Sequence, residues 1–213
     1  MEIKIENVTY KGTRILFKDS AKRKRDLLNS MMGILYSYGY EEMMLPSIQL
    51  ASTFAGKVGA ENNNMMYNFT DRGNRELCLS PEYTAIAMKM VDGIFKYQKD
   101  VKLFYIGECF RGENCQNGRY RQFTQFGVEI LNPSKDYLPE LIEISTKLIE
   151  LVTNNYELNL SAIRGLDYYN GNGFEISCPE LGSSKQVVGG GAYKGGVGFA
   201  LGIDRILCLL KHN

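Results

Sequence analysis

The sequence predicts an α+β fold in which an antiparallel β-sheet is flanked by helices. Three observations lead to this prediction: two extended segments around a polar loop in the middle of the chain, further strand-like segments in the last third, and two stretches with helical spacing. With 213 residues, 44% of them hydrophobic, the chain is large enough for one core, so we expect a single domain over residues 1–213.

The first helix is predicted within residues 19–40. Apolar side chains recur there at spacings of one, three and four, as on one face of a helix: Leu27, Leu28, Met31, Met32 and Leu35. Asp19 and Ser20 are candidate caps at its start, and Gly39 is a candidate stop. Residues 41–46 then predict a short strand that ends at a proline, whose missing N–H suits the edge of a sheet.

The middle of the chain predicts a hairpin followed by a second helix. Residues 103–110 and 122–130 are extended segments, and the polar, glycine-containing residues 112–120 connect them. Residues 139–152 return to helical spacing, with Pro139 suited to the first helical position. A strand is expected at residues 157–160.

The last third predicts two strands and a helix. Residues 167–177 and 186–191 are strand-like, and residues 195–210 read as a glycine-rich start that leads into an apolar helix.

Charge and composition exclude several kinds of function. Lysine and arginine (25) nearly balance aspartate and glutamate (24), so no broad basic surface is predicted, and any contact with RNA should be local. The single histidine, His212, argues against Ser-His-Asp and Cys-His catalysis and against a metal site built from histidine and cysteine. Five cysteines without a C-x-x-C pair, no signal peptide and no membrane-spanning apolar run predict a cytoplasmic protein with no membrane contact.

The densest group of polar residues lies on the predicted hairpin. It comprises Arg111, Glu113, Arg119, Arg121, Gln125 and Glu129. Because side chains two residues apart on a strand share a face, Arg119 should project with Arg121, and Gln125 with Glu129. Arginines directed at one pocket suit a polyphosphate, since a guanidinium donates two hydrogen bonds to phosphate oxygens. The alternative is a solvated loop with structural ion pairs.

Three other segments carry candidate site residues. Small residues from 198 to 202 precede Arg205 and would let a ligand approach the backbone, although close packing of a helix on a sheet is the alternative. Residues 164–169 combine an arginine with two tyrosines, which could also be one core ring and one surface ring. Glu82 and Thr84 open a predicted helix, where plain capping is the alternative.

In their order along the chain and in their amino-acid sequence, these segments resemble the histidyl-tRNA synthetase family of class II aminoacyl-tRNA synthetases. The resemblance covers almost the whole chain: motif 1 ends at Pro46, motif 2 is residues 110–129, the histidine-specific motif is residues 164–169, and motif 3 is residues 198–205. Its most specific strings are Arg119-Tyr120-Arg121-Gln122-Phe123 and Arg164-Gly165-Leu166-Asp167-Tyr168-Tyr169.

The resemblance implies the catalytic core fold of class II synthetases, ATP and Mg²⁺ as cofactors, and a role for each candidate residue. Arg111 would hold the α-phosphate of ATP and Arg205 the γ-phosphate, and Arg164 would stabilise charge during the reaction. Glu113 and Arg119 would complete the nucleotide site. The amino-acid pocket would be formed by Glu82, Thr84, Gln125, Glu129, Tyr168, Tyr169 and Tyr193.

The resemblance is incomplete in three places. The insertion that the family carries after motif 2 is missing, the chain leaves no room for an anticodon-binding domain, and Ala192 and Lys194 replace a cation and an acid expected beside the amino-acid pocket. We therefore expect a domain that activates histidine or a related amino acid as an adenylate, acts as a homodimer through motif 1, and contacts at most the acceptor end of a tRNA. The alternative is the non-catalytic regulatory subunit of ATP phosphoribosyltransferase, which would require a hetero-oligomeric partner.

Overall fold

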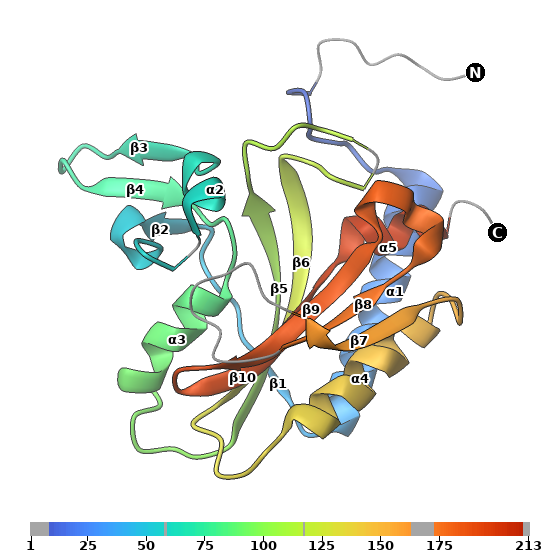
Figure 1. Ribbon diagram of the computed structural model, residues 1–213. Coiled ribbons are helices and arrows are strands. Elements are labelled where there is room, and N and C mark those ends of the chain that lie inside the picture. Colours follow the sequence, from blue (N-terminus) through green and yellow to red (C-terminus); the bar gives the residue numbers. More distant parts are fainter. Residues whose placement is uncertain (1–8, 58, 117, 163–172, 211–213) are drawn as a thin grey trace.

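The computed structural model describes residues 9–57, 59–116, 118–162 and 173–210, and a large sheet with helices on both faces dominates it (Figure 1). Within these residues, seven strands form this sheet in the order β1-β5-β6-β10-β9-β8-β7, and three short strands form a second sheet in the order β2-β4-β3. In the large sheet β1 pairs with β5 in parallel, and the other neighbouring strands are antiparallel. The predicted α+β fold with a mostly antiparallel sheet is confirmed.

The strands are β1 (Glu41–Glu42), β2 (Ile48–Leu50), β3 (Asn68–Thr70), β4 (Glu76–Leu79), β5 (Val101–Phe110), β6 (Gln122–Leu131), β7 (Glu157–Ala162), β8 (Gly173–Ser177), β9 (Gln186–Tyr193) and β10 (Gly196–Gly202). The α-helices are α1 (Lys18–Ser37), α2 (Gly59–Asn64), α3 (Thr84–Asp92), α4 (Leu138–Glu150) and α5 (Ile203–Leu209). Two 3₁₀ segments, η1 (Ala51–Thr53) and η2 (Pro179–Ser184), complete the list.

Helix α1 begins one residue before the predicted caps. Phe17 is its N-cap residue, and the Ser20 hydroxyl accepts a hydrogen bond from the Phe17 N–H (3.1 Å), so Ser20 stabilises the first turn from inside it. Asp19 lies in the same turn, where a carboxylate is favourable to the helix dipole. At the other end Gly39 has a φ of 77°, a left-handed conformation that ends the helix as predicted.

The predicted hairpin is confirmed, and its strands are the second and third of the seven-stranded sheet. β5 and β6 pair along their whole length, from Val101 opposite Leu131 to Phe110 opposite Gln122. The predicted strand at residues 41–46 is shorter than expected, since only Glu41 and Glu42 pair with β5, but it does lie at an edge of the sheet.

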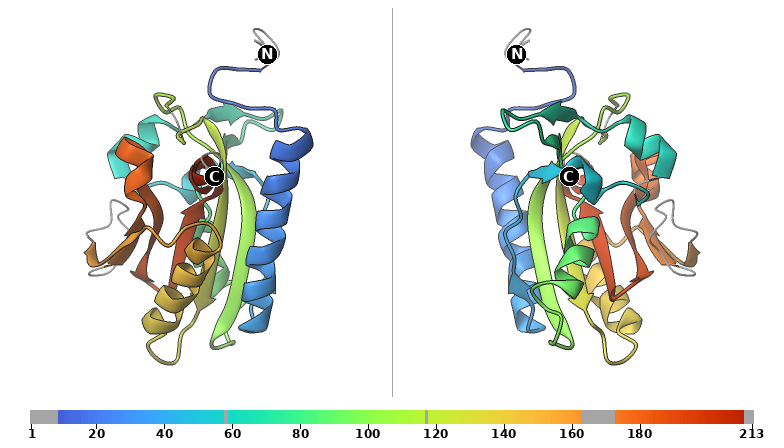
Figure 2. Two further views of the ribbon diagram at one scale, coloured as in Figure 1. Left: turned by 90° about the vertical axis from the view of Figure 1, so that its right-hand side faces the viewer. Right: turned by 90° about the vertical axis from the view of Figure 1, so that its left-hand side faces the viewer.

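Two clusters of buried side chains hold helices against opposite faces of the sheet. One cluster joins α1, α4 and α5 to the sheet, and it includes Met31, Leu35, Phe104, Phe126 and Ile144. The other joins α3 and the short segments around it to the opposite face through residues such as Tyr83 and Tyr105. Figure 2 shows α1 and α3 on opposite sides of β5 and β6.

The prediction for residues 195–210 was wrong in its first half. Residues 196–202 form β10, a central strand between β6 and β9, and only residues 203–209 are helical. Val197, Phe199 and Leu201 alternate along β10 and enter the first cluster, whereas Gly198 and Ala200 between them lie on the opposite face, which α3 covers. The strand is hard to recognise in the sequence because small residues occupy its alternate positions, where a strand pattern would usually show larger side chains: Gly196, Gly198, Ala200 and Gly202.

The remaining predicted elements agree with the structure within a few residues. α4 begins at Leu138 with Pro139 in its first turn, and β7 and β9 include the strands expected at residues 157–160 and 186–191. Of the strand expected at residues 167–177, β8 forms residues 173–177, and residues 167–172 lie outside the described residues. Among the described residues, no helix is long and apolar enough to span a membrane.

Candidate active site

The candidate site lies on the face of the large sheet that α3 covers. Directly opposed residues of neighbouring strands share a face, so the register defines what this face presents. Tyr105 of β5 lies opposite Gly127 of β6, and Gly107 lies opposite Gln125. Farther across the sheet, Glu129 of β6 lies opposite Gly198 of β10.

Glu129 is the centre of the end of the site that is formed by carboxyl groups. Its side chain is 1% exposed, and it accepts hydrogen bonds from the Thr84 hydroxyl (2.9 Å) and the Tyr193 hydroxyl (2.7 Å). Burial raises the pKa of Glu129 to about 8, although both hydroxyls favour the charged form, and the nearby Glu82 raises the pKa further. Both hydrogen bonds described for this carboxyl come from neutral donors, so a cationic ligand would complete it.

Glu82 lies beside Glu129 at the start of α3. It is 2% exposed, and one of its oxygens accepts a hydrogen bond from the Ala85 N–H (3.0 Å), so it also caps the helix. Both carboxyls act on Tyr105, whose pKa is raised by burial and then by Glu129 and Glu82. Two buried carboxyl groups therefore face the same small volume.

Gln125 is held in one orientation next to these carboxyls. Its Nε2 donates to the Tyr105 hydroxyl (2.8 Å), and its Oε1 accepts from the Cys109 thiol (3.0 Å). Neither Tyr105 nor Cys109 was singled out from the sequence. The sequence pattern could have identified them, because every second residue of β5 from Tyr105 to Cys109 shares a face with Gln125 and Glu129 of β6.

Three arginines form the other end of the site. The Arg111 Nε donates to the carbonyl oxygen of Pro81 (2.9 Å), and its Nη1 lies 3.8 Å from the Glu113 carboxylate. The Arg119 Nε is buried and makes no hydrogen bond within the described part of the chain. Arg205, from the start of α5, donates through Nη1 to the carbonyl oxygen of Gln186 (2.5 Å).

The arginines are close enough to repel one another. Burial lowers the pKa of Arg205, Arg119 and Arg111 lower it further, and Glu113 opposes them. Like charges held together in a partly buried place are costly unless an anion binds between them. This end of the site is therefore suited to a polyanion such as a polyphosphate.

Small residues cover the sheet next to the two charged ends. Ala200 of β10 pairs with Gly127 and Gly189, and Gly191 of β9 pairs with Gly198. Gly198 itself leaves no room for a ligand, because a Cβ there would lie 1.9 Å from the Glu129 carboxylate. The glycine that the sequence suggested for ligand approach instead makes space for an acidic side chain.

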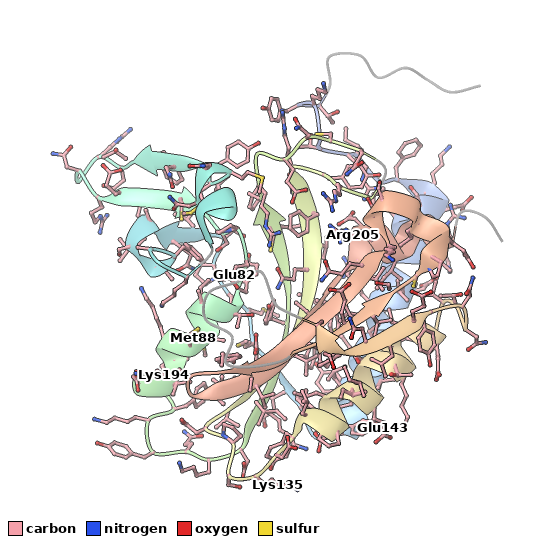
Figure 3. All side chains as sticks on the ribbon, in the orientation of Figure 1. Glu82, Met88, Lys135, Glu143, Lys194 and Arg205 are labelled. Atoms are coloured by element: carbon pink, nitrogen blue, oxygen red, sulfur yellow. The ribbon has the colours of Figure 1, made fainter. Side chains whose placement is uncertain are left out.

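The structure brings most of the predicted site residues together. Glu82, Thr84, Gln125, Glu129 and Tyr193 form the carboxyl end, and Arg111, Glu113, Arg119 and Arg205 form the arginine end. In Figure 3, Glu82 lies beside the start of α3 and Arg205 beside α5, with β5 and β6 between them. Arg164, Tyr168 and Tyr169 lie outside the described residues.

Ala192 and Lys194 were both expected beside the amino-acid pocket. Ala192 is exposed and pairs with Val197, so it lies on the face opposite to Tyr193. Lys194 is exposed in the turn between β9 and β10. The expectation that these two residues border the pocket was wrong for Ala192, because adjacent residues of a strand point to opposite faces.

Comparison with known proteins gives a consistent result. The family model for histidyl-tRNA synthetase matches residues 12–154. The histidine–tRNA ligase of Methanosarcina acetivorans is 27% identical over 92% of this chain and 74% of its own length. That of Archaeoglobus fulgidus is 36% identical over 72% of this chain and 38% of its own length.

Solved structures agree on the fold. The apo histidyl-tRNA synthetase of S. aureus superimposes with a TM-score of 0.76 at 26% identity, over 99% of this chain and 70% of that protein. A Bacillus halodurans C protein described as an ATP phosphoribosyltransferase regulatory subunit/histidyl-tRNA synthetase superimposes with a TM-score of 0.79. Its 15% identity shows a shared fold alone.

Proposed function

The chain belongs to the histidyl-tRNA synthetase family, and from this premise we propose that it activates histidine with ATP to form an aminoacyl-adenylate. One observation supports this proposal more than any other. The buried carboxyl groups of Glu82 and Glu129 adjoin the group of three arginines, because Arg111 donates to the carbonyl oxygen of Pro81, the residue before Glu82, and both Arg111 and Arg119 act on Arg205.

This distribution of charge matches the two substrates. The ammonium group of an amino acid is a cation that suits Glu82 and Glu129, and the phosphates of ATP are anions that suit the arginines. Because the two ends adjoin through Pro81 and Glu82, the amino-acid carboxylate would lie near the α-phosphate. Fixed geometry of this kind is a large part of catalysis between two bound substrates.

The reaction needs charge stabilisation more than proton transfer. An oxygen of the amino-acid carboxylate attacks the α-phosphorus, an O–P bond forms, and the bond from that phosphorus to the oxygen bridging to the β-phosphate breaks. Pyrophosphate leaves with the electron pair. The attacking carboxylate is already ionised at neutral pH, so no general base is required, and arginines that hold the developing phosphate charge do the main work.

Magnesium would accompany the ATP phosphates. Among the described residues no group of three or more histidine, cysteine, aspartate or glutamate side chains could hold a metal ion. This is compatible with Mg²⁺, which usually binds through substrate phosphates with one or two carboxylates and several waters. Glu113, beside Arg111, is the carboxylate suited to that position.

Exchange of radioactive pyrophosphate into ATP tests the proposal. We expect exchange that depends on histidine, and we expect Arg119→Met to reduce it by about 10²-fold or more, the usual cost of losing one preorganised charge donor. Arg75→Met is the matched control, since Arg75 is an exposed arginine paired with Asp71 and should leave exchange unchanged. Exchange no faster with any amino acid than without one would rule out adenylate formation.

The same exchange experiment distinguishes an adenylate-forming enzyme from a regulatory subunit. A regulatory subunit would need to bind an amino acid but would not need three arginines around a phosphate site. Calorimetric binding of histidine together with no exchange would favour the regulatory function. The relatives are tRNA ligases, so we propose the acceptor end of a tRNA as the recipient of the activated amino acid.

A further inference from the structure

A segment before α1 contacts both parts of the chain that carry the arginines. We call residues 10–16 the N-terminal strap. The Gly12 carbonyl oxygen accepts hydrogen bonds from the backbone N–H groups of Arg121 (2.8 Å) and Gln122 (3.3 Å). Gly12 has a φ of 90°, and a Cβ there would lie 2.4 Å from the Cys115 Sγ, so only glycine allows this contact.

Arg121 connects the strap to the loop between β5 and β6. Its Nη1 donates to the Tyr10 hydroxyl (2.7 Å), and its Nε donates to the Glu113 carbonyl oxygen (3.2 Å). Its backbone carbonyl accepts from the Arg111 N–H (2.9 Å). A single residue thus links the strap to the two loop positions, 111 and 113, that are assigned to ATP.

Arg14 connects the strap to α5. Its guanidinium forms an ion pair with Asp204 and lies 3.7 Å from the centroid of the Tyr120 ring. Asp204 is 4% exposed, and its other oxygen accepts from the backbone N–H of Thr124 (2.5 Å). Asp204 directly precedes Arg205, so the pair fixes the start of the helix that carries the third arginine.

Helix α1 joins the same network. Lys24 donates to the Thr124 hydroxyl (2.5 Å), and that hydroxyl donates to Glu108 (2.6 Å). The described residues around these groups line a cavity of ≈ 300 Å³, to which Arg14 and Asp204 contribute. Because this space lies next to Arg14, a methionine in place of Arg14 can be accommodated without displacing core side chains.

We propose that the N-terminal strap is a positioning element of the nucleotide site, in which Gly12 and the Arg14–Asp204 pair hold the β5–β6 loop and α5 in register for ATP. This inference rests on the proposed function. None of these groups needs to touch ATP. They act through Arg111, Glu113 and Arg205.

The electrostatics of the site explain why such an element is needed. Before ATP binds, Arg111, Arg119 and Arg205 repel one another, and this repulsion opposes a closely assembled site. The strap holds the loop and α5 from the outer side with backbone hydrogen bonds and one ion pair. Preorganisation of this kind reduces what the ligand must spend on ordering the site.

Steady-state exchange kinetics test the proposal with three variants. Arg14→Met removes the ion pair, Gly12→Ala pushes the strap away from Cys115 and Arg121, and Arg14→Lys keeps the charge. For the first two we expect KM for ATP to rise about 10-fold or more while KM for histidine stays within about twofold, since small misplacements of binding groups have effects of this size. Arg14→Lys should recover part of the loss. Asp71→Asn, which breaks an exposed ion pair, is the control.

Hydrogen exchange of the Arg121 amide gives a second measurement on the same proteins. The proposal requires faster exchange of this amide in Gly12→Ala than in the unaltered chain, well below the unfolding midpoint. Variants that unfold at lower temperature but keep both KM values and the amide protection would show that the strap only stabilises the fold. An equal rise in KM for ATP and in KM for histidine would also overturn the proposal. If the unaltered chain binds no ATP, the proposed function is wrong, and the positioning role of the strap is wrong with it. If the unaltered chain catalyses the exchange and the variants have the same KM values, only the positioning role of the strap is wrong.

Discussion

At the scale of single residues, Glu129 is the group whose state depends most on its surroundings. A carboxyl with an ordinary pKa near 4.5 would be charged at pH 7, but burial raises the pKa of Glu129 to about 8. The empty site would then hold a neutral acid. A bound ammonium or imidazolium group would favour the charged form, so binding of such a cation should release a proton.

The raised pKa predicts how stability depends on pH. Between about pH 5 and pH 8 the folded chain holds a proton on Glu129 that the unfolded chain has lost, so stability falls as pH rises through this window. The contribution of one such group is at most about 1.4 kcal/mol per pH unit. Urea unfolding at pH 5, 6.5 and 8 should show this slope in the parent and a smaller slope in Glu129→Gln.

Glu143→Gln is the matched control for this measurement. Glu143 is exposed, and its bond from Lys147 lowers its pKa, so it is ionised in both states across the same window. Its replacement should leave the slope unchanged. Equal slopes in the parent and in Glu129→Gln would contradict the raised pKa.

At the scale of elements, β10 shows how a strand can be required by its neighbours. On the face that α3 covers, Gly198 has no side chain, and this leaves room for the Glu129 carboxylate that accepts a hydrogen bond from Tyr193. The opposite side of the strand carries Val197, Phe199 and Leu201 into the core. One strand therefore serves packing with one set of positions and the site with the other.

We predict that Gly198→Ala destabilises the chain by about 1–3 kcal/mol, the usual range for overpacking, and weakens histidine binding. The added Cβ would lie 1.9 Å from the Glu129 carboxylate and 2.6 Å from the backbone oxygen of Val128, which cannot move freely. Gly33→Ala is the opposite case, because this exposed helical glycine has no atom within 4 Å of the new methyl group. It should stabilise the chain by about 0.5–1 kcal/mol. Calorimetry measures the stability of both variants, and titration measures their affinity for histidine. Equal changes in Gly198→Ala and Gly33→Ala would contradict the prediction.

At the scale of the whole molecule, the segment that runs from the edge strand β1 into β2 carries exposed apolar side chains. Met44 is 86% exposed and Ile48 is 55% exposed, in the segment that follows the two-residue edge strand β1. Apolar side chains gathered at a sheet edge are typical of an interface. This is the motif 1 region, where the resemblance implied a homodimer.

We predict that the chain dimerises through this edge and that Met44→Glu raises the dissociation constant of the dimer about tenfold or more, since it places a charge in an apolar contact. Sedimentation velocity over a range of concentrations measures the shift. Leu160→Glu is the control, because Leu160 is 59% exposed on β7 at the opposite edge of the sheet. A parent that stays monomeric at all concentrations would contradict the prediction.

The sequence by itself determined the elements with a clear period and the residue types of the site. The leucines and methionines of α1, Pro139 at the start of α4 and the two arms of the β5–β6 hairpin could be identified because each pattern belongs to consecutive residues. The arginines of the hairpin could be identified because guanidinium groups suit phosphates, whereas the role of the carboxylates was implied by the family resemblance.

Only the tertiary structure decided how these groups meet. Glu129 and Tyr193 are 64 positions apart, Arg14 and Asp204 are 190 apart, and no local period relates them. The strand nature of β10, the outward direction of Ala192 and the raised pKa of Glu129 all follow from neighbouring strands and from burial. Periodicity depends on consecutive residues, whereas register, burial and electrostatics depend on residues that only the folded chain brings into contact.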